Sequence, residues 1–407
     1  MTDLLTSRLL IACGSYDGTV FAMSYDPANS HENGPSRLKS EFIDPEAHTV
    51  PVSALAVCGD TVASGSGDEA IQVLFSVSRR HRMGCLEFHS GTIRHLIFAD
   101  SHHLLSTGED SCIAIWRCSG SNKITQNSHK WQCIRQMRRH KAPIRAMALH
   151  PSKRLAFSIA DSEGDHTLRI WSLTRGRQAY TSRLRALNAE GASDISVVKE
   201  GSFHFLLVQV AAPTFHRLDI FDLNHATHKA VFSARFPVLL SRPPVVFHVD
   251  EDCIYLLVGI GCLLRAYKCQ FNRIRMEVIA ESRIQGKRFK FLKALPWHEK
   301  GKLIAMVTSD ADGSYVRGYI LDLEGIKEKS EGDKTVPSLC LKPIFAYDVP
   351  GIRITQADAV WTSPSEENEG VETLQEVELD DDDEESDEHS DVSMEGDTNS
   401  TSGSDES

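Results

Sequence analysis

One short pattern recurs along the chain and constrains the fold more than any other feature. Residues 93–118 and 144–173 each contain an apolar strand, a turn, a second apolar strand, an acidic turn and a third strand. Residues 52–77 repeat this order, and residues 9–26 begin at its second strand. Apolar and polar residues alternate, with Gly, Asp and Ser interrupting them about every eight to twelve residues, as is typical of antiparallel sheets. We therefore expect an all-β protein built from repeated sheets.

The spacing inside the repeats is nearly constant. Asp110 precedes Trp116 by six residues, and Asp165 precedes Trp171 by six. Histidines open three of the units, at His48, His89 and His140. The first interval is 41 residues, within the roughly 40–45 of a four-stranded propeller blade. The second is 51 residues, and the polar residues 119–130 account for the excess as an expected loop insertion.

These units resemble WD repeats. The segments IAIWRC and LRIWSL stand where that family has its Trp-Asp dipeptide, with Arg117 and Ser172 in place of the aspartate. The resemblance implies that an opening His, a second-strand Ser, the turn Asp and the third-strand Trp form a hydrogen-bonded tetrad. The two implied tetrads are His89, Ser106, Asp110 and Trp116, and His140, Ser158, Asp165 and Trp171.

Less regular units follow the clear ones, at residues 194–224, 243–269 and 290–324. The N-terminal unit lacks its first strand, and residues 351–361 are expected to supply it by pairing with that unit, with residues 327–336 as a loop leading into this strand. Such pairing closes a propeller and leaves no open edge between its ends. The predicted fold is a seven-bladed WD-repeat β-propeller over residues 1–363, with a disordered acidic tail over residues 364–407.

The tail accounts for the negative charge of the chain. Residues 364–407 contain 19 Asp and Glu but no Lys or Arg, whereas residues 1–363 contain 44 basic residues against 37 acidic ones. A dense run of like charge with few apolar residues predicts disorder. The tail is either a solvating appendage, an interaction tail for basic partners or a competitor for the basic body. Its most acidic run is Asp380, Asp381, Asp382, Asp383, Glu384 and Glu385.

Catalysis is not expected. The same His, Ser and Asp recur from unit to unit, whereas an enzyme needs one such site, and the sequence has no P-loop, Gly-x-Ser-x-Gly or His-Glu-x-x-His motif. None of the ten cysteines forms a Cys-x-x-Cys pair, so we expect no metal and no cofactor. The sequence contains no run of about 18 apolar residues, so we expect no membrane-spanning helix.

Two basic stretches, residues 130–141 and 283–293, are candidate contacts to RNA phosphates or to an acidic protein. The alternative is a solvated rim that keeps the protein soluble. The candidate residues are Arg138, Arg139, Lys287, Arg288, Lys290 and Lys293.

Within the WD-repeat family, the order of features resembles one eukaryotic branch. That branch contains the fungal maintenance-of-killer factor and the animal p21-activated-kinase-interacting protein. The resemblance rests on LLIACGSYDGTVFAMS, VASGSGDEAIQVL, the two tetrad units and RITQADAVW. It implies a nuclear, largely nucleolar, non-catalytic assembly factor for the 60S ribosomal subunit. Such a factor acts as a monomer within a larger particle and binds ribosomal proteins and other assembly factors, with rRNA as a further candidate contact.

Two other functions stay open at this point. The first is a signalling scaffold that binds and inhibits a p21-activated-type kinase. The second is a chaperone for basic proteins that works through the acidic tail.

Overall fold

The computed structural model shows an all-β protein. It describes residues 7–29, 35–72, 75–77, 81–119, 130–162, 164–187, 189–225, 229–236, 240, 243–272, 275–297, 301–322 and 336–362. The helical structure among these residues is a single 3-10 turn at Pro27–Asn29. They lie in one compact unit, Met1–Glu372. The predicted disordered tail, including its acidic run at residues 380–385, lies outside the described residues.

Six sheets contain four antiparallel strands in regular order. The first combines β3 (Lys39–Asp44), β2 (Val20–Tyr25), β1 (Arg8–Ser15) and β30 (Ile354–Thr362). The next two are β10 (Ile93–Asp100), β11 (His103–Gly108), β12 (Ile113–Ser119) and β13 (Lys130–Met137), then β14 (Ala146–Leu149), β15 (Leu155–Ser162), β16 (Asp165–Ser172) and β17 (Arg177–Arg183). The fourth is β18 (Ala192–Glu200), β19 (Phe203–Ala211), β20 (His216–Asp222) and β21 (Phe232–Phe236).

The last two regular sheets come from the less repeat-like part of the sequence. They are β22 (Val245–Val249), β23 (Cys253–Ile260), β24 (Leu263–Gln270) and β25 (Arg275–Arg283), then β26 (Arg288–Trp297), β27 (Gly301–Ser309), β28 (Gly313–Asp322) and β29 (Leu341–Pro350). The β18–β21 sheet and these two sheets correspond to the three less regular units expected from the sequence. Alternating apolar residues therefore formed sheets here without the His, Asp and Trp signature.

Residues 52–87 form a less regular arrangement. A four-stranded sheet contains β4 (Val52–Cys58), β5 (Thr61–Ser66), β7 (Phe75–Ser76) and β8 (His81–Arg82). A two-stranded sheet contains β6 (Ala70–Gln72) and β9 (Cys85–Glu87). Residues 73–74 and 78–80, between these short strands, lie outside the described residues.

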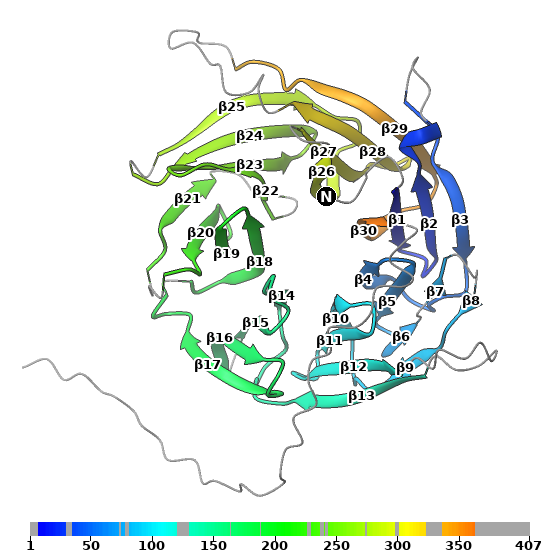
Figure 1. Cartoon of the computed structure of the whole chain (residues 1–407), viewed down its shortest axis with the longest axis vertical. Helices are drawn as coiled ribbons and strands as arrows, with labels where there is room; N and C mark the ends of the chain where they lie inside the picture. The colour runs from blue at the N-terminus through cyan, green and yellow to red at the C-terminus, as the bar shows by residue number, and fades with distance from the viewer. Residues whose placement is uncertain are drawn as a thin grey trace, which may run out of the picture. The chain divides into compact units, whose positions relative to one another are not determined.

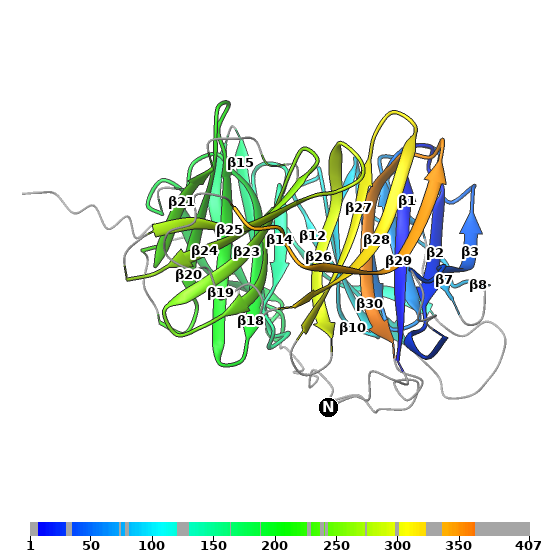
Figure 2. The same ribbon diagram turned by 90° about the horizontal axis from the view of Figure 1, so that it is seen from above.

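The sheets of this unit are arranged around a ring, as in a β-propeller (Figure 1). The strands β30, β4, β10, β14, β18, β22 and β26 lie toward its centre, and strands such as β3, β13, β17 and β21 lie on its outside (Figure 1). Seen from the side, the strands of neighbouring sheets run between the same two faces (Figure 2).

The C-terminal strand β30 completes the N-terminal sheet. It pairs antiparallel with β1, with Leu9 opposite Trp361 and Ala12 opposite Asp358. This strand falls almost entirely within residues 351–361, the segment that the sequence assigned to this place. Because both ends of the described chain share one sheet, the ring has no open sheet edge at the join.

The strand β29, which precedes the join, was not predicted from the sequence. We expected residues 327–336 to lead as a loop into the closing strand, but β29 lies between them and pairs with β28. Before β29, Leu339 donates its N–H to the carbonyl of Glu281 in β25. The side chains of β29 are mostly exposed or half-buried, so this outer strand lacks the apolar alternation that identifies half-buried strands.

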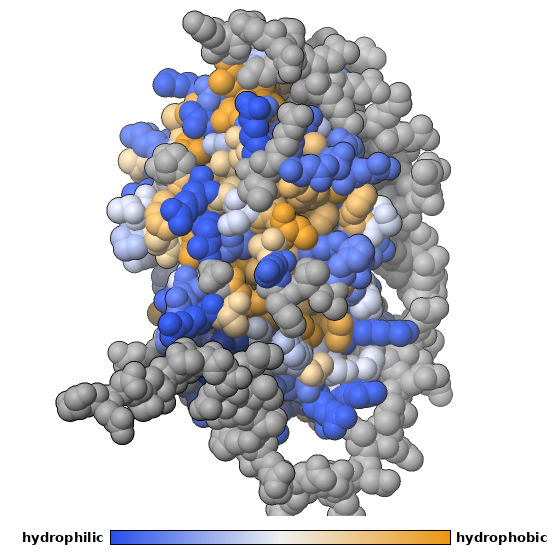
Figure 3. Space-filling model, turned by 90° about the vertical axis from the view of Figure 1, so that its left-hand side faces the viewer, coloured by the Kyte–Doolittle hydropathy of each residue, from blue (hydrophilic) through white to orange (hydrophobic). Residues whose placement is uncertain are grey.

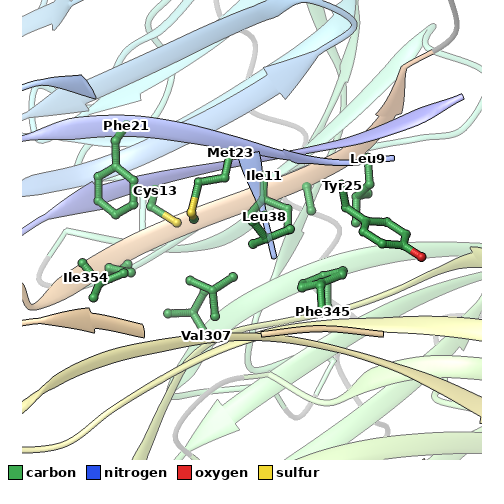
Figure 4. Close-up of a cluster of buried hydrophobic side chains, with 14 of the residues drawn as sticks. Leu9, Ile11, Cys13, Phe21, Met23, Tyr25, Leu38, Val307, Phe345 and Ile354 are labelled. Atoms are coloured by element: carbon green, nitrogen blue, oxygen red, sulfur yellow. The ribbon is translucent and has the colours of Figure 1, made fainter. Parts of the chain in front are cut away.

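The cores lie between neighbouring sheets rather than in the centre of the ring. Leu9, Ile11 and Met23 of the first sheet pack with Val307 and Phe345 of the β26–β29 sheet (Figure 4). All five side chains are essentially inaccessible to solvent. Each sheet therefore buries apolar residues on both faces, which explains the strongly apolar second strands of the repeats.

Candidate functional site

The connections between sheets gather on one face of the ring. Four antiparallel strands return the chain to the face at which the first strand began, so each outer strand leads to the next inner strand on that face. The turns between second and third strands lie there as well. We call it the connection face. It includes residues 138–145 after β13, residues 284–287 after β25, and the turns at residues 109–112 and 310–312.

The turn at residues 109–112 is held by a buried network. His89 lies in the connection before β10, and its Nδ1 is 2.9 Å from Asp110 Oδ2. Its Nε2 is 2.7 Å from Ser106 Oγ in β11. Trp116 in β12 donates Nε1–H to the same hydroxyl at 2.8 Å. Four residues from the connection, two strands and a turn thus form one hydrogen-bonded unit.

The next sheet contains the same arrangement. His140 Nδ1 lies 2.8 Å from Asp165 Oδ2, and His140 Nε2 lies 2.7 Å from Ser158 Oγ. Trp171 donates Nε1–H to Ser158 Oγ at 2.8 Å. The structure therefore brings together all four residues of each tetrad named from the sequence.

These networks have the order of a Ser–His–Asp catalytic triad but serve another purpose. Ser106 and Ser158 are completely buried, and an indole N–H donates to each hydroxyl. A nucleophilic serine needs a hydroxyl that reaches a substrate carbonyl. Here each hydroxyl is enclosed between a histidine and a tryptophan, so the network braces the sheet.

The carboxylates in the braces have lowered pKa values. Burial alone would raise the pKa of Asp165, but hydrogen bonds from His140, from the Thr167 hydroxyl at 2.6 Å and from the Lys141 N–H at 2.9 Å outweigh burial. The pKa of Asp165 falls to about 2. The same balance of burial against a bond from His89 lowers the pKa of Asp110.

A third brace in the irregular sheet was not assigned from the sequence. His48 Nδ1 is 3.0 Å from Asp68 Oδ2, and His48 Nε2 is 2.9 Å from Ser64 Oγ. Burial lowers the pKa of His48, and Asp68 partly offsets that effect. The spacing of His48 and Asp68 within the repeat was the available signal.

The β26–β29 sheet uses different side chains for the same task. Thr308 donates its hydroxyl to the Gln285 carbonyl at 2.6 Å, and Tyr315 donates its hydroxyl to Asp310 at 2.9 Å. The buried Arg317 donates to Gln285 Oε1 and to Asp348. No spacing rule taken from the regular repeats reveals this set.

The six basic candidate residues separate into two groups. Arg138, Arg139, Lys287 and Arg288 are exposed on or beside the connection face. The guanidinium of Arg138 lies 5.3 Å from the centre of the Phe88 ring. These four side chains remain available to a partner, although the two pairs extend from different sheets.

The other two candidates lie inside β26. Lys290 is half-buried at a β-bulge between Phe289 and Phe291. Lys293 donates to Asp358 Oδ1 at 2.7 Å and to the Ala359 carbonyl at 2.9 Å, both in β30. Lys293 therefore joins two sheets of the ring, a role that the basic run in the sequence did not indicate.

The described part of the chain contains neither a metal-binding cluster nor a membrane-spanning helix. Its His, Cys, Asp and Glu residues form no cluster of three or more that could hold a metal ion. A helix long and apolar enough for membrane crossing is likewise absent from it.

Known proteins resemble this chain in sequence and fold. The family model for the WD domain, G-beta repeat, matches residues 81–117 and 131–172. The p21-activated protein kinase-interacting protein 1-like of Gallus gallus is 27% identical over 81% of this chain and 75% of its own length. Protein MAK11 of Saccharomyces cerevisiae is 29% identical over 46% of each chain. The crystal structure of RRP9 WD40 repeats superposes with a TM-score of 0.51 at 13% identity, over 85% of this chain and 91% of that one.

Proposed function

We propose that this WD40-repeat protein, a relative of MAK11 and of p21-activated protein kinase-interacting proteins, is a non-catalytic scaffold in 60S ribosomal subunit assembly. It works in the nucleus, largely in the nucleolus, as one copy within a larger particle. Its partners are assembly factors and ribosomal proteins of the precursor, together with rRNA. The family resemblance of the sequence supports this assignment.

One observation carries the non-catalytic part of the proposal. The recurring His, Ser and Asp groups, the residues best suited to chemistry, are buried and bonded to one another in at least three sheets. Exposed cations near the His140 brace include Arg138 and Arg139. A rigid body with enclosed reactive groups and exposed charge suits binding rather than turnover.

The proposal includes the number of blades and the domain boundary. The irregular strands β4–β9 occupy one position between the β30–β3 sheet and the β10–β13 sheet (Figure 1). We count them as one blade, which gives seven with the six regular sheets. Residues 1–363 then form the propeller, and residues 364–407 form an acidic tail that shields basic partners.

Sedimentation of the tagged full-length protein from cells tests the proposal. We expect comigration with precursor 60S particles that contain large-subunit precursor rRNA, and loss of comigration after RNase treatment. A variant with Asp380–Asp383 and both following glutamates changed to Asn and Gln tests the tail in the same gradients. Migration only in light fractions, unaffected by RNase, would overturn the assembly role.

A second function is favoured by two relatives that are named as p21-activated protein kinase-interacting proteins. In this alternative, the propeller binds and inhibits a p21-activated-type kinase. It predicts a kinase in the light fractions and no response to RNase. The same gradients therefore separate the two functions.

A further inference from the structure

The positive charge of the folded body is concentrated in a small part of it. Residues 131–187 contain 12 Lys and Arg against three Asp and Glu, a net charge of +9. The whole of residues 1–363 has a net charge of +7, so the remainder of the body is slightly negative. The excess therefore belongs to β13 and to the β14–β17 sheet, rather than to the ring as a whole.

These cations are on the surface, and the two described acids of the same segment are already engaged. Eleven of the 12 side chains are exposed, and Arg169 is half-buried. Asp161 is bonded to His166 at 2.6 Å and accepts the Gly191 N–H, while Asp165 belongs to the His140 brace. The third acid, Glu163, lies outside the described residues. The two described carboxylates are thus committed to the fold.

The outer strand β17 collects several of the arginines along one line. Arg177 and Arg183 are its first and last residues, and Arg175 and Arg185 lie two residues beyond its two ends. Between them Tyr180 exposes 47% of its surface. A strand of this length spans roughly 20 Å. The side of the ring seen in Figure 3 shows hydrophilic side chains among exposed apolar ones.

The neighbouring sheet contributes a further arginine to this line. Gly176 adopts a φ of +61°, and a Cβ there would come within 2.5 Å of Arg135 Nε. The missing side chain of Gly176 thus leaves room for the Arg135 guanidinium of β13 beside Arg175 and Arg177. We call Arg135, Arg175, Arg177, Tyr180, Arg183 and Arg185 the β17 surface.

A like-charge effect extends this positive region toward the connection face. Burial lowers the pKa of Arg169. Asp165 counteracts this effect, whereas the positive charge of Arg139 lowers the pKa further. Arg139 is therefore close enough to Arg169 to repel it. Such an accumulation of positive charge is unfavourable in the isolated protein and is relieved by a bound polyanion.

We propose that the β17 surface binds the phosphate backbone of single-stranded RNA. The choice of RNA rests on the proposed function, and the choice of phosphate rests on the side chains. Arginine presents a planar fork that matches phosphate oxygens, and five of the six residues are arginines. Cations spread over about 20 Å match the successive phosphates of a nucleic-acid strand better than they match a single small anion. The exposed Tyr180 ring offers a base a face for stacking.

Fluorescence anisotropy of the full-length protein with a labelled single-stranded RNA of about 20 nucleotides tests this inference. The test variant is Arg175→Ala, Arg177→Ala, Arg185→Ala. The matched control is Arg37→Ala, Lys199→Ala, Lys342→Ala, which removes three exposed charges that lie outside residues 131–187 and outside the six basic candidate residues. Both retain the acidic tail, and urea denaturation verifies that both are folded.

We expect the wild-type affinity to fall steeply with salt. The test variant should bind at least about tenfold more weakly, with a log–log salt slope shallower by about 2, because each phosphate contact to a single strand contributes about 0.7. The control should stay within about threefold of the wild type.

Several results would overturn the inference. These are equal losses in both variants, absence of salt-dependent RNA binding, and binding of polyglutamate but not RNA, which would assign the β17 surface to an acidic protein. The sedimentation gradients of cell extracts test the proposed function separately. A test variant that loses RNA in vitro yet comigrates with precursor particles supports the inference and leaves the assembly role to protein contacts.

Discussion

Asp358 in β30 accepts a hydrogen bond from Lys293 Nζ in β26 at 2.7 Å, across the position where the ring closes. Its second carboxylate oxygen accepts the N–H of Val57 in β4 at 3.0 Å. One carboxylate therefore joins three sheets. Since β30 and β1 come from opposite ends of the described chain, this residue lies where the ring depends on long-range pairing.

We expect Asp358→Ala to lower the free energy of unfolding by about 1–2 kcal/mol. The loss leaves a half-buried ammonium and a backbone N–H without their acceptor, and partial exposure of the pair reduces the effect. Urea denaturation with an unchanged m-value measures the change. Asp312→Ala, at an exposed turn, is the control and should stay within about 0.5 kcal/mol of the wild type. Equal effects of both substitutions would show that the three-sheet contact contributes nothing.

Ser158→Ala tests the brace in the β14–β17 sheet. The variant leaves His140 Nε2 and Trp171 Nε1 without their shared partner in a buried site, which should cost about 2–3 kcal/mol. Ser152→Ala, at an exposed turn, should change stability by less than about 0.5 kcal/mol. Thermal or urea unfolding compares the two. A loss below about 1 kcal/mol for Ser158→Ala would contradict the bracing role.

The pKa of Asp165 makes part of the stability dependent on pH. A carboxyl with a pKa of about 2 in the folded protein and an ordinary value near 3.9 when unfolded stabilises the fold above pH 4. This contribution is lost as the pH falls from about 4 toward 2. We expect the stability advantage of the wild type over Asp165→Asn to shrink by about 2 kcal/mol over that range. Denaturation of both proteins at pH 5, 4, 3 and 2 measures it, and a constant difference would refute the assignment.

The sequence located features that depend on local spacing. His89, Ser106, Asp110 and Trp116 occupy positions set by strand length and turn type, so one repeat predicts another. The closing strand was also accessible, because the N-terminal unit visibly lacked its first strand. Both predictions use a pattern that the folded repeat imposes on its own sequence.

Other features depend on contacts that spacing does not encode. Lys293 looked like a surface cation because its partner Asp358 lies 65 residues away in another sheet. The strand β29 was not predicted because the side chains of an outer strand need not be apolar. The brace around Arg317 replaces the usual residues with chemically different ones, so only the packed structure brings them together.

Gly318 in β28 marks the tightest approach between the chain and a core aromatic. A Cβ at this position would lie 2.2 Å from the Phe345 ring of β29, and Phe345 is fully buried between two sheets (Figure 4). We expect Gly318→Ala to destabilise the protein by about 2 kcal/mol, because the ring has no free space into which to move. Phe345→Leu in the Gly318→Ala background should recover part of that loss, although Phe345→Leu alone destabilises the wild type. A double-mutant cycle by urea denaturation measures the coupling, and additive effects of the two changes would show that the ring and the glycine are independent.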